Sequence, residues 1–399
     1  MKIYEIGTGY TPIPAQMGAA TEIVVEELTR SFVKNGENVE IIDIGTISRK
    51  PTELPITEVK VPKVFSSTDV SLGIMHKLKR VVYSVCLANR LKKILKHSTE
   101  KTVLHFHNQY NLFFAMKLIG RKLLSKAVLA YTVHSYIWHG AWESIENDIK
   151  NRYFQEVFCI ENADIVFVLN DTTKNNIIEH TSVKAERVIQ IENGVNLDTY
   201  KPLSADMKES AKARFGVSGK RVFVQVGSVC DRKNQLESVR LLLSLLAEDK
   251  ECVFCYAGGV ISEEYRTMLT EYADQNGIGD RVIYAGELSP GAELNEFYNM
   301  ADAMIFPSKA EGFSLVIIEA MSAGVPVVVN SDLRFDLSEE CLRYTDEEDF
   351  LHLLKTKVLD ETAGAELSRR VRETVADRYG WHVVAEKYKA AFLVADQTK

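Results

Sequence analysis

The sequence of 399 residues lacks several features that mark common classes of protein. It contains no run of about eighteen apolar residues, the length that a membrane-spanning helix needs. Its start, MKIYEIGTGYTPIP, has neither the charged segment nor the continuous apolar segment of a secretory signal peptide. The six cysteines are scattered, mostly in or beside apolar segments, which indicates core residues rather than a metal or redox site. These absences predict a globular, cytoplasmic protein.

Two nucleotide-binding motifs are also missing. The segment GTGYTPIP after the first predicted strand is not a GxGxxG motif, because Thr11 and Pro12 interrupt it. The pattern GxxxxGK[ST] does not occur. Dinucleotide-dependent oxidoreductases and P-loop enzymes are therefore disfavoured.

Acidic residues are absent from one long segment. The net charge of −7 argues against a general nucleic-acid binder, but residues 70–99 contain no aspartate or glutamate. Within 75–97, cations alternate with apolar residues at roughly helical spacing. One interpretation is a basic amphipathic helix that rests on an anionic membrane or on an anionic acceptor. The alternative is a solvated helix packed on a sheet. The segment's cations are Lys77, Lys79, Arg80, Arg90, Lys92, Lys93 and Lys96.

What the chain does contain is material for two sizeable cores, with 46% hydrophobic residues and no composition typical of disorder. Short β-branched runs alternate with longer amphipathic stretches, which predicts α/β architecture with doubly wound parallel sheets. We expect one Rossmann-like domain over 1–200 and a second over 201–379, with a helix over 380–397. The predicted strands are 2–7, 38–44, 102–107, 127–134, 163–170 and 187–193, and then 221–227, 252–259, 281–287, 301–308 and 325–330.

The segment KAEGFSLVIIEAMSAGVPVVVN, residues 309–330, places two carboxylates around the start of a predicted helix. Backbone N–H groups at such a start suit an anionic or hydroxyl-rich ligand. Glu311, just before the helix, suits sugar hydroxyls or a developing cation, and Glu319, inside an apolar run, needs partners such as a ribose diol. The alternative for each is an ordinary helix carboxylate. The expected N–H donors are Phe313, Ser314 and Leu315.

Other polar residues also follow predicted strands, where ligands of such sheets bind. Arg232 and Lys233 follow the strand that ends at Gly227, and they would meet a nucleotide diphosphate. His134 ends another strand and could donate to a sugar hydroxyl, although a satisfied core histidine is equally consistent.

A further pair of histidines, His105 and His107, alternates along the strand VLHFHN, so the two side chains share one face. We interpret this pair as structural or as lining a cleft. The prediction includes no metal site.

Together these segments resemble the family 4 retaining glycosyltransferases, which have the GT-B fold of two Rossmann-like domains facing across a cleft. The resemblance runs through most of the chain and is most specific in ADAMIFPSKAEGFSLVIIEAMSAGVPVVV, where two glutamates are separated by seven residues. It implies that Glu311 lies at the reacting sugar, that Glu319 binds the ribose and that His134 contacts a sugar hydroxyl. It further implies that Gly18 and Gly227 allow close approach of backbone and ligand, and that the last helix packs on the first domain.

The resemblance implies the transfer of a sugar from a nucleoside diphosphate sugar to a hydroxyl of an unidentified acceptor. The expected nucleotide of the donor is UDP, with GDP as the alternative. Retention at the anomeric carbon, no metal and no cofactor are implied as well. One departure concerns the cation that usually follows the glycine of the clamp strand, because this chain has Ser228 there. Arg232 is then the candidate for the second cation beside Lys233. The alternatives are a sugar-nucleotide 2-epimerase and a catalytically silent GT-B protein that binds a glycan or a partner.

Overall fold

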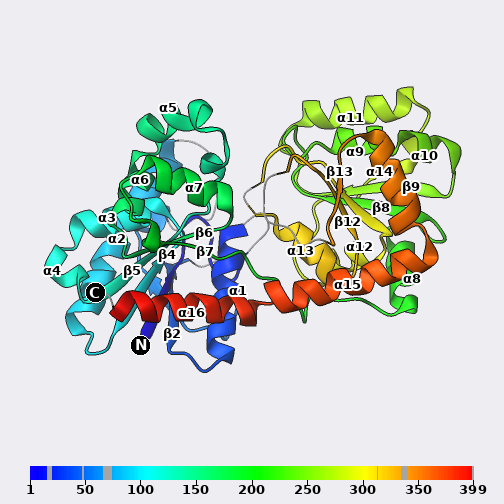
Figure 1. Ribbon diagram of the computed structural model, residues 1–399. Helices are drawn as coiled ribbons and strands as arrows, with labels where there is room; N and C mark the ends of the chain where they lie inside the picture. Colours follow the sequence, from blue (N-terminus) through cyan, green and yellow to red (C-terminus); the bar gives the residue numbers. More distant parts are fainter. Residues whose placement is uncertain (16–19, 47–48, 66–73, 312, 334–339, 398–399) are drawn as a thin grey trace. The chain divides into compact units, whose positions relative to one another are not determined.

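The chain folds into two compact units. The computed structural model describes residues 1–15, 20–46, 49–65, 74–311, 313–333 and 340–397 (Figure 1). Unit 1 comprises Met1–Gly194 and Trp381–Lys399, and unit 2 comprises Val195–Gly380. The division therefore falls a few residues before the predicted boundary at residue 200, and the chain returns to unit 1 at Trp381.

Unit 1 is built on a seven-stranded parallel sheet with the order β3-β2-β1-β4-β5-β6-β7. The central strands pair in a register that places Glu5 beside His105, and His105 beside Ala130. The strands are β1 (Lys2–Ile6), β2 (Val39–Ile44), β3 (Ile56–Val59), β4 (Thr102–Phe106), β5 (Ala127–Thr132), β6 (Ile165–Val168) and β7 (Val188–Gln190).

Helices cover this sheet, as the alternating sequence pattern predicts. Asn108 caps the N-terminus of α3 and Asn170 that of α7, each by accepting hydrogen bonds from backbone N–H groups. The elements are α1 (Ala20–Lys34), η1 (Lys63–Phe65), α2 (Ile74–His97), α3 (Gln109–Leu118), α4 (Arg121–Leu124), η2 (Tyr136–His139), α5 (Trp142–Arg152), α6 (Phe154–Asn162), α7 (Asp171–His180), η3 (Ala185–Arg187) and α16 (Trp381–Gln397).

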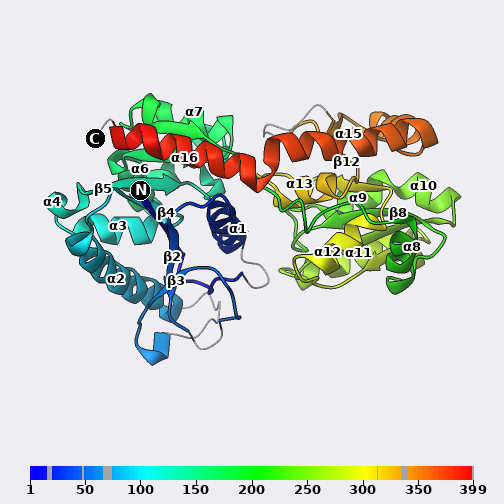
Figure 2. The ribbon, with the colours of Figure 1, turned by 90° about the horizontal axis from the view of Figure 1, so that it is seen from below.

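Helix α16 packs on unit 1, where it lies against α1 and β5 (Figure 2). Its Tyr388 and Phe392 are fully buried, and their rings meet the ring of Phe167 at centroid distances of 4.6 and 5.7 Å. Burying a large aromatic side chain stabilises a fold by about 2 to 3 kcal/mol, so α16 is part of the core of unit 1.

Unit 2 is built on a six-stranded parallel sheet with the order β10-β9-β8-β11-β12-β13. Its strands are β8 (Arg221–Val226), β9 (Cys252–Ala257), β10 (Val282–Tyr284), β11 (Ala303–Phe306), β12 (Val327–Asn330) and β13 (Leu342–Tyr344). Its other elements are α8 (Ala205–Arg214), α9 (Gln235–Leu241), α10 (Leu243–Glu248), α11 (Glu263–Gln275), η4 (Gly279–Arg281), α12 (Ala292–Asn299), α13 (Leu315–Ser322), α14 (Glu347–Leu353), η5 (Leu354–Val358) and α15 (Glu361–Tyr379).

The two faces of the second sheet support separate clusters of apolar residues. Cys255 belongs to one cluster and Cys252 to the other, and both side chains are buried as free thiols. The prediction that this CxxC pair lies on opposite faces of a strand is therefore confirmed.

The predicted fold class is confirmed, since both units are Rossmann-like parallel sheets with covering helices. Each expected strand is present with shorter bounds. The prediction was wrong in omitting β3 and β13, which lie at the edges of their sheets. Edge strands are short and partly exposed, so they lack the continuous apolar run that identifies a central parallel strand.

The helices of the described ranges are all too short or too polar to cross a lipid bilayer.

Candidate active site

In unit 2, the loop between β8 and α9 presents the two predicted cations. The Nε2 of Gln225, on β8, donates to the backbone carbonyl of Lys233 at 2.7 Å, and Asn234 takes a left-handed conformation with φ 59°. Gly227 has φ +150°, and a Cβ there would come within 3.2 Å of the Lys233 side chain. Glycine at this position therefore leaves room for the lysine stem to lie flat against the backbone.

Glu311 lies directly opposite these cations, in the loop after β11. Its Oε1 atom is 2.6 Å from Lys233 Nζ and 2.9 Å from Arg232 Nη1. The side chains of Lys233 and Glu311 are nearly buried, with exposed fractions of 11% and 9%. The side chain of Arg232 is 44% exposed. Burial lowers the pKa of Lys233, and the Glu311 charge opposes that shift. Lys233 and Glu311 therefore form a partly desolvated ion pair, with the more exposed Arg232 as a second cation beside it.

Backbone and hydroxyl contacts hold this arrangement in place. The Ser308 hydroxyl donates to Glu311 Oε1 at 2.5 Å. The backbone N–H of Lys309 donates to the carbonyl of Arg232 at 2.9 Å, which ties the two loops together. Because β8 and β11 are neighbours in the sheet, loops that are far apart in sequence meet at one edge.

The helix start expected near Phe313 is α13, whose N-cap is Ser314. Within the described ranges, the backbone N–H groups of Ser314 and Leu315 have no hydrogen-bond acceptor. The ring of Phe313 packs against Tyr379 at a centroid distance of 5.8 Å. The helix start therefore offers donors to an anionic ligand beside the Lys233–Glu311 pair.

Glu319 lies inside α13 and is buried. The hydroxyl of Tyr298, on α12, donates to its Oε2 atom at 2.9 Å. Burial raises the pKa of Glu319 to about 7, although the hydrogen bonds from Tyr298 and Tyr200 work in the opposite direction. Its hydrogen-bond partners are neutral tyrosine hydroxyls, so a ligand that supplies further hydroxyl donors would stabilise the charged form of Glu319.

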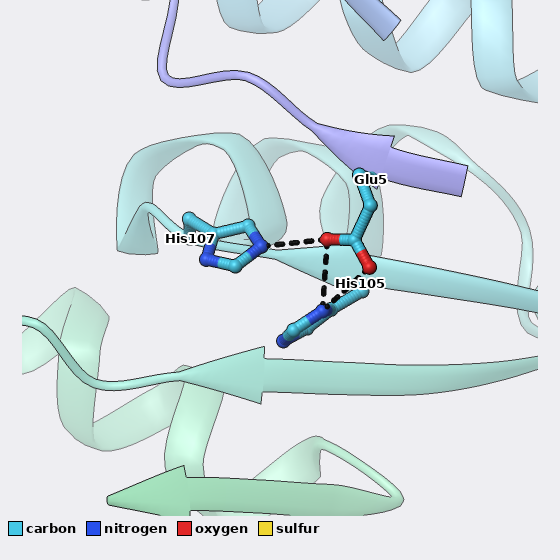
Figure 3. A group of neighbouring side chains, drawn as sticks. All are labelled: Glu5, His105 and His107. Atoms are coloured by element: carbon cyan, nitrogen blue, oxygen red, sulfur yellow. Dashed lines mark hydrogen bonds and ion pairs between the residues drawn. The ribbon is translucent and has the colours of Figure 1, made fainter. Parts of the chain in front are cut away.

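In unit 1, polar side chains at the ends of β1, β4 and β5 form a second cluster. Glu5 accepts hydrogen bonds from His105 and His107, as Figure 3 shows, and all three side chains are buried. His107 Nδ1 lies 3.0 Å from Nε2 of His134, which follows β5 and is half-buried. The prediction that His105 and His107 share one face is confirmed. The nitrogen and oxygen atoms of Glu5, His105 and His107 lie within 4.8 Å of one another, a spacing that a metal ion could also use.

Comparison with protein families identifies the family of the chain. The family model described as Glycosyltransferase Family 4 matches residues 21–199, and the one described as Glycosyl transferases group 1 matches residues 207–334. A third, Family 4 Glycosyltransferase in conflict systems, matches residues 289–387. The chain belongs to glycosyltransferase family 4.

Known proteins similar to this glycosyltransferase span most of its length. "Uncharacterized glycosyltransferase MJ1607" of Methanocaldococcus jannaschii is 24% identical over 83% of this chain and 80% of its own. The N-acetyl-alpha-D-glucosaminyl L-malate synthase of Bacillus anthracis is 22% identical over 96% of both chains. The crystal structure of Anabaena Alr3699/HepE with UDP and glucose has 16% identity, a TM-score of 0.70 and coverage of 98% of both chains, which supports the GT-B fold.

The structure brings together most of the residues predicted for unit 2. Lys233, Arg232, Glu311 and Gly227 meet in one cluster, whereas Gly18 lies outside the described residues. Sequence reasoning missed three supporting residues. One of them, Glu5, could have been noticed because it lies inside the strand KIYEI, and a buried acid needs a partner. The missed residues are Glu5, Tyr298 and Ser308.

We predict that Glu319→Gln stabilises unit 2 at high pH and not at low pH. A pKa raised from about 4.5 to about 7 means that the folded state holds the proton more tightly than the unfolded state. The stabilisation from the protonated carboxyl is therefore complete below the unfolded pKa and is lost as pH rises through 7. The gain of the variant over the wild type should increase by roughly 3 kcal/mol between pH 4.5 and pH 8.

The measurement is denaturant unfolding of ligand-free protein at several pH values. Glu296→Gln is the control, because this residue is a surface partner of Arg214 on the same helix as Tyr298. This variant measures how much of the change across the pH range comes from replacing a surface carboxylate. A difference between Glu319→Gln and wild type that is equal at both ends of the range would contradict the raised pKa.

Proposed function

We propose that this glycosyltransferase transfers a sugar from a nucleoside diphosphate sugar to an acceptor hydroxyl with retention of anomeric configuration. The observation that carries the proposal is the Lys233–Glu311 contact of 2.6 Å, with Arg232 at 2.9 Å from the same oxygen. A carboxylate and two cations at the end of a parallel sheet suit a ligand whose sugar is neutral and whose diphosphate is anionic.

The diphosphate would compete with Glu311 for Lys233 and Arg232. Phosphate oxygens accept hydrogen bonds from both cations and from the backbone N–H groups of Ser314 and Leu315 at the start of α13. Glu311, released from the cations, then faces the sugar. In this proposal the cations and N–H groups stabilise the leaving diphosphate, and no metal ion is required.

The bond between the anomeric carbon and the diphosphate oxygen breaks, and its electron pair remains on the diphosphate. The acceptor oxygen bonds to the same carbon from the same face, and its proton passes to the departing phosphate oxygen. Glu311 would stabilise the positive charge that develops on the sugar. Retention follows from attack on the face that the diphosphate leaves.

The nucleotide would bind with its ribose hydroxyls at Glu319, whose buried carboxylate accepts a hydrogen bond from the Tyr298 hydroxyl at 2.9 Å and another from Tyr200. We favour UDP over GDP because the similar Anabaena structure contains UDP and glucose. The acceptor remains unidentified: a glycan, a lipid or a small molecule.

We further propose that α2 contacts the anionic, cytoplasmic face of a membrane. It carries exposed cations on the same helix as the exposed apolar residues Leu78 (45% exposed) and Val81 (41%). Two cations of the predicted segment do not share this surface: Lys79 donates to the carbonyl of Tyr10, and Arg80 stacks over the Tyr10 ring. The remaining exposed cations are Lys77, Arg90, Lys92, Lys93 and Lys96.

We predict that UDP and UDP-glucose bind in the presence of EDTA, and that Lys233→Ala weakens both. Loss of a charge-assisted hydrogen bond to phosphate should reduce affinity about tenfold to a hundredfold. Calorimetric titration with UDP, GDP and ADP, each with and without glucose attached, measures this. Lys309→Ala is the matched control, because this lysine pairs with Asp231 on the surface nearby. Equal affinities for the two variants, or no binding of any nucleotide, would contradict the proposal.

We also predict that slow hydrolysis of UDP-glucose without acceptor releases α-glucose first, because water replaces the acceptor on the same face. Glu311→Gln should lower this rate about a hundredfold, and Glu296→Gln should not change it. Proton NMR during the first turnovers identifies the anomer before it equilibrates. Initial release of β-glucose would refute retention.

We predict that vesicles containing anionic lipid retain the protein at low salt and release it at roughly 0.5 M salt, where charges are screened within a few ångströms. Sedimentation with the vesicles measures the bound fraction. Lys92→Glu combined with Lys93→Glu should abolish binding. Lys150→Glu combined with Arg152→Glu makes the same charge change on α5 and should leave binding intact. Failure of the wild type to sediment at low salt would end the membrane proposal.

A further inference from the structure

A continuous path of hydrogen bonds connects the buried Glu5 to His134. Glu5 Oε2 is 2.8 Å from His107 Nε2, and His107 Nδ1 is 3.0 Å from His134 Nε2. The planes of the two rings are inclined by 28°, and the ring centroids lie 5.3 Å apart. Glu5 and His107 have almost no exposed surface, so water does not compete for these contacts. Figure 3 shows the first of the two bonds.

Burial and neighbouring side chains determine the charges of Glu5 and His107, at the buried end of this path. Burial alone would raise the pKa of Glu5, but the hydrogen bonds and charge interactions with His105 and His107 outweigh it and hold the pKa at about 2. Burial and the neighbouring His105 lower the pKa of His107 to about 4. At neutral pH the path therefore begins with a carboxylate, which only accepts, followed by a neutral imidazole.

These charges determine which nitrogen of each ring carries the proton. Because the Glu5 carboxylate only accepts, His107 must donate from Nε2. Neutral His107 then has its lone pair on Nδ1, so His134 must donate from Nε2. Burial also lowers the pKa of His134, which leaves its remaining nitrogen, Nδ1, as an acceptor. Within the described ranges, no hydrogen bond engages this Nδ1 atom.

We propose that Glu5 and His107 are positioning residues that hold His134 in its neutral, Nε2-protonated tautomer, which leaves Nδ1 as an acceptor for a sugar hydroxyl. The ligand assignment rests on the proposed function, whereas the tautomer does not. A sugar carboxylate at this position would meet a lone pair instead of a donor. The arrangement therefore selects a neutral, hydroxyl-bearing group and disfavours a uronate.

Glu5 also forms a hydrogen bond with His105, which holds the carboxylate in place and does not change the tautomer expected at His134. His105 Nδ1 is 3.1 Å from Glu5 Oε1, and His105 Nε2 is 2.7 Å from the Thr132 hydroxyl. A hydroxyl can donate or accept, so these contacts are satisfied whether or not His105 carries a charge. The direction of the bonds between Glu5, His107 and His134 is unaffected.

The direct test is NMR of ligand-free protein carrying ¹⁵N-labelled histidine, since the nitrogen shifts of an imidazole distinguish its two tautomers from the cation. Single variants of the nine histidines assign the signals. We expect His107 and His134 to be neutral and protonated at Nε2 at pH 7. Protonation of either at Nδ1, a cationic form of either, or a stoichiometric metal ion bound to this cluster would overturn the proposal.

A pair of variants separates positioning from simple packing. In His107→Gln the carboxamide retains one donor for Glu5 and one acceptor for His134, whereas His107→Leu removes both. His107→Gln should preserve the His134 tautomer and keep the affinity for UDP-glucose within about threefold of wild type. In His107→Leu, His134 should populate both tautomers, and affinity should fall about tenfold.

Equal tautomer populations at His134 in the two variants would overturn the proposal. If His107→Leu does not fold, the wild-type spectrum still decides the matter. If no UDP-sugar binds although His134 has the expected tautomer, the proposed donor is wrong and the positioning role of Glu5 and His107 stands. A binding preference for UDP-glucuronate over UDP-glucose would overturn the assignment of His134 as an acceptor for a sugar hydroxyl.

Discussion

Both clusters depend on the geometry of parallel sheets, in which the carboxyl ends of all strands lie at one edge. In unit 2, β8 and β11 are neighbours, so the loops that follow them bring Lys233 and Glu311 together across a long stretch of sequence. In unit 1, the adjacent strands β1, β4 and β5 do the same for Glu5, His107 and His134. Strand order thus decides which side chains can cooperate.

Within that geometry, the partners of each buried carboxylate determine its charge. Glu5 is surrounded by two histidines and stays ionised, with a pKa of about 2. Glu319 has neutral tyrosine hydroxyls as its partners, and its pKa rises to about 7. Glu311 faces two cations directly. The same functional group is therefore prepared as a fixed anion, as a group that titrates near neutrality and as one half of an exchangeable ion pair.

Much of the fold followed from the sequence, because central parallel strands are buried on both sides and read as continuous apolar runs such as CVFCYA. Lys233 and Glu311 were recognisable because each follows such a strand. The edge strands β3 and β13 were not, since their few residues are partly exposed. Glu5 was missed because its importance depends on pairing between β1 and β4, which no local pattern records. Tyr298 and Ser308 likewise depend on contacts between separate elements.

The return of the chain to unit 1 at Trp381 makes that unit discontinuous. Tyr388 and Phe392 of α16 pack at 5.2 and 5.4 Å from the ring of His105, so the histidine cluster is covered by residues that follow unit 2 in the chain. During synthesis on the ribosome, unit 2 is complete before α16 emerges. Unit 1 is therefore synthesised first in part and completed last. Its histidine cluster is not covered until α16 has been synthesised.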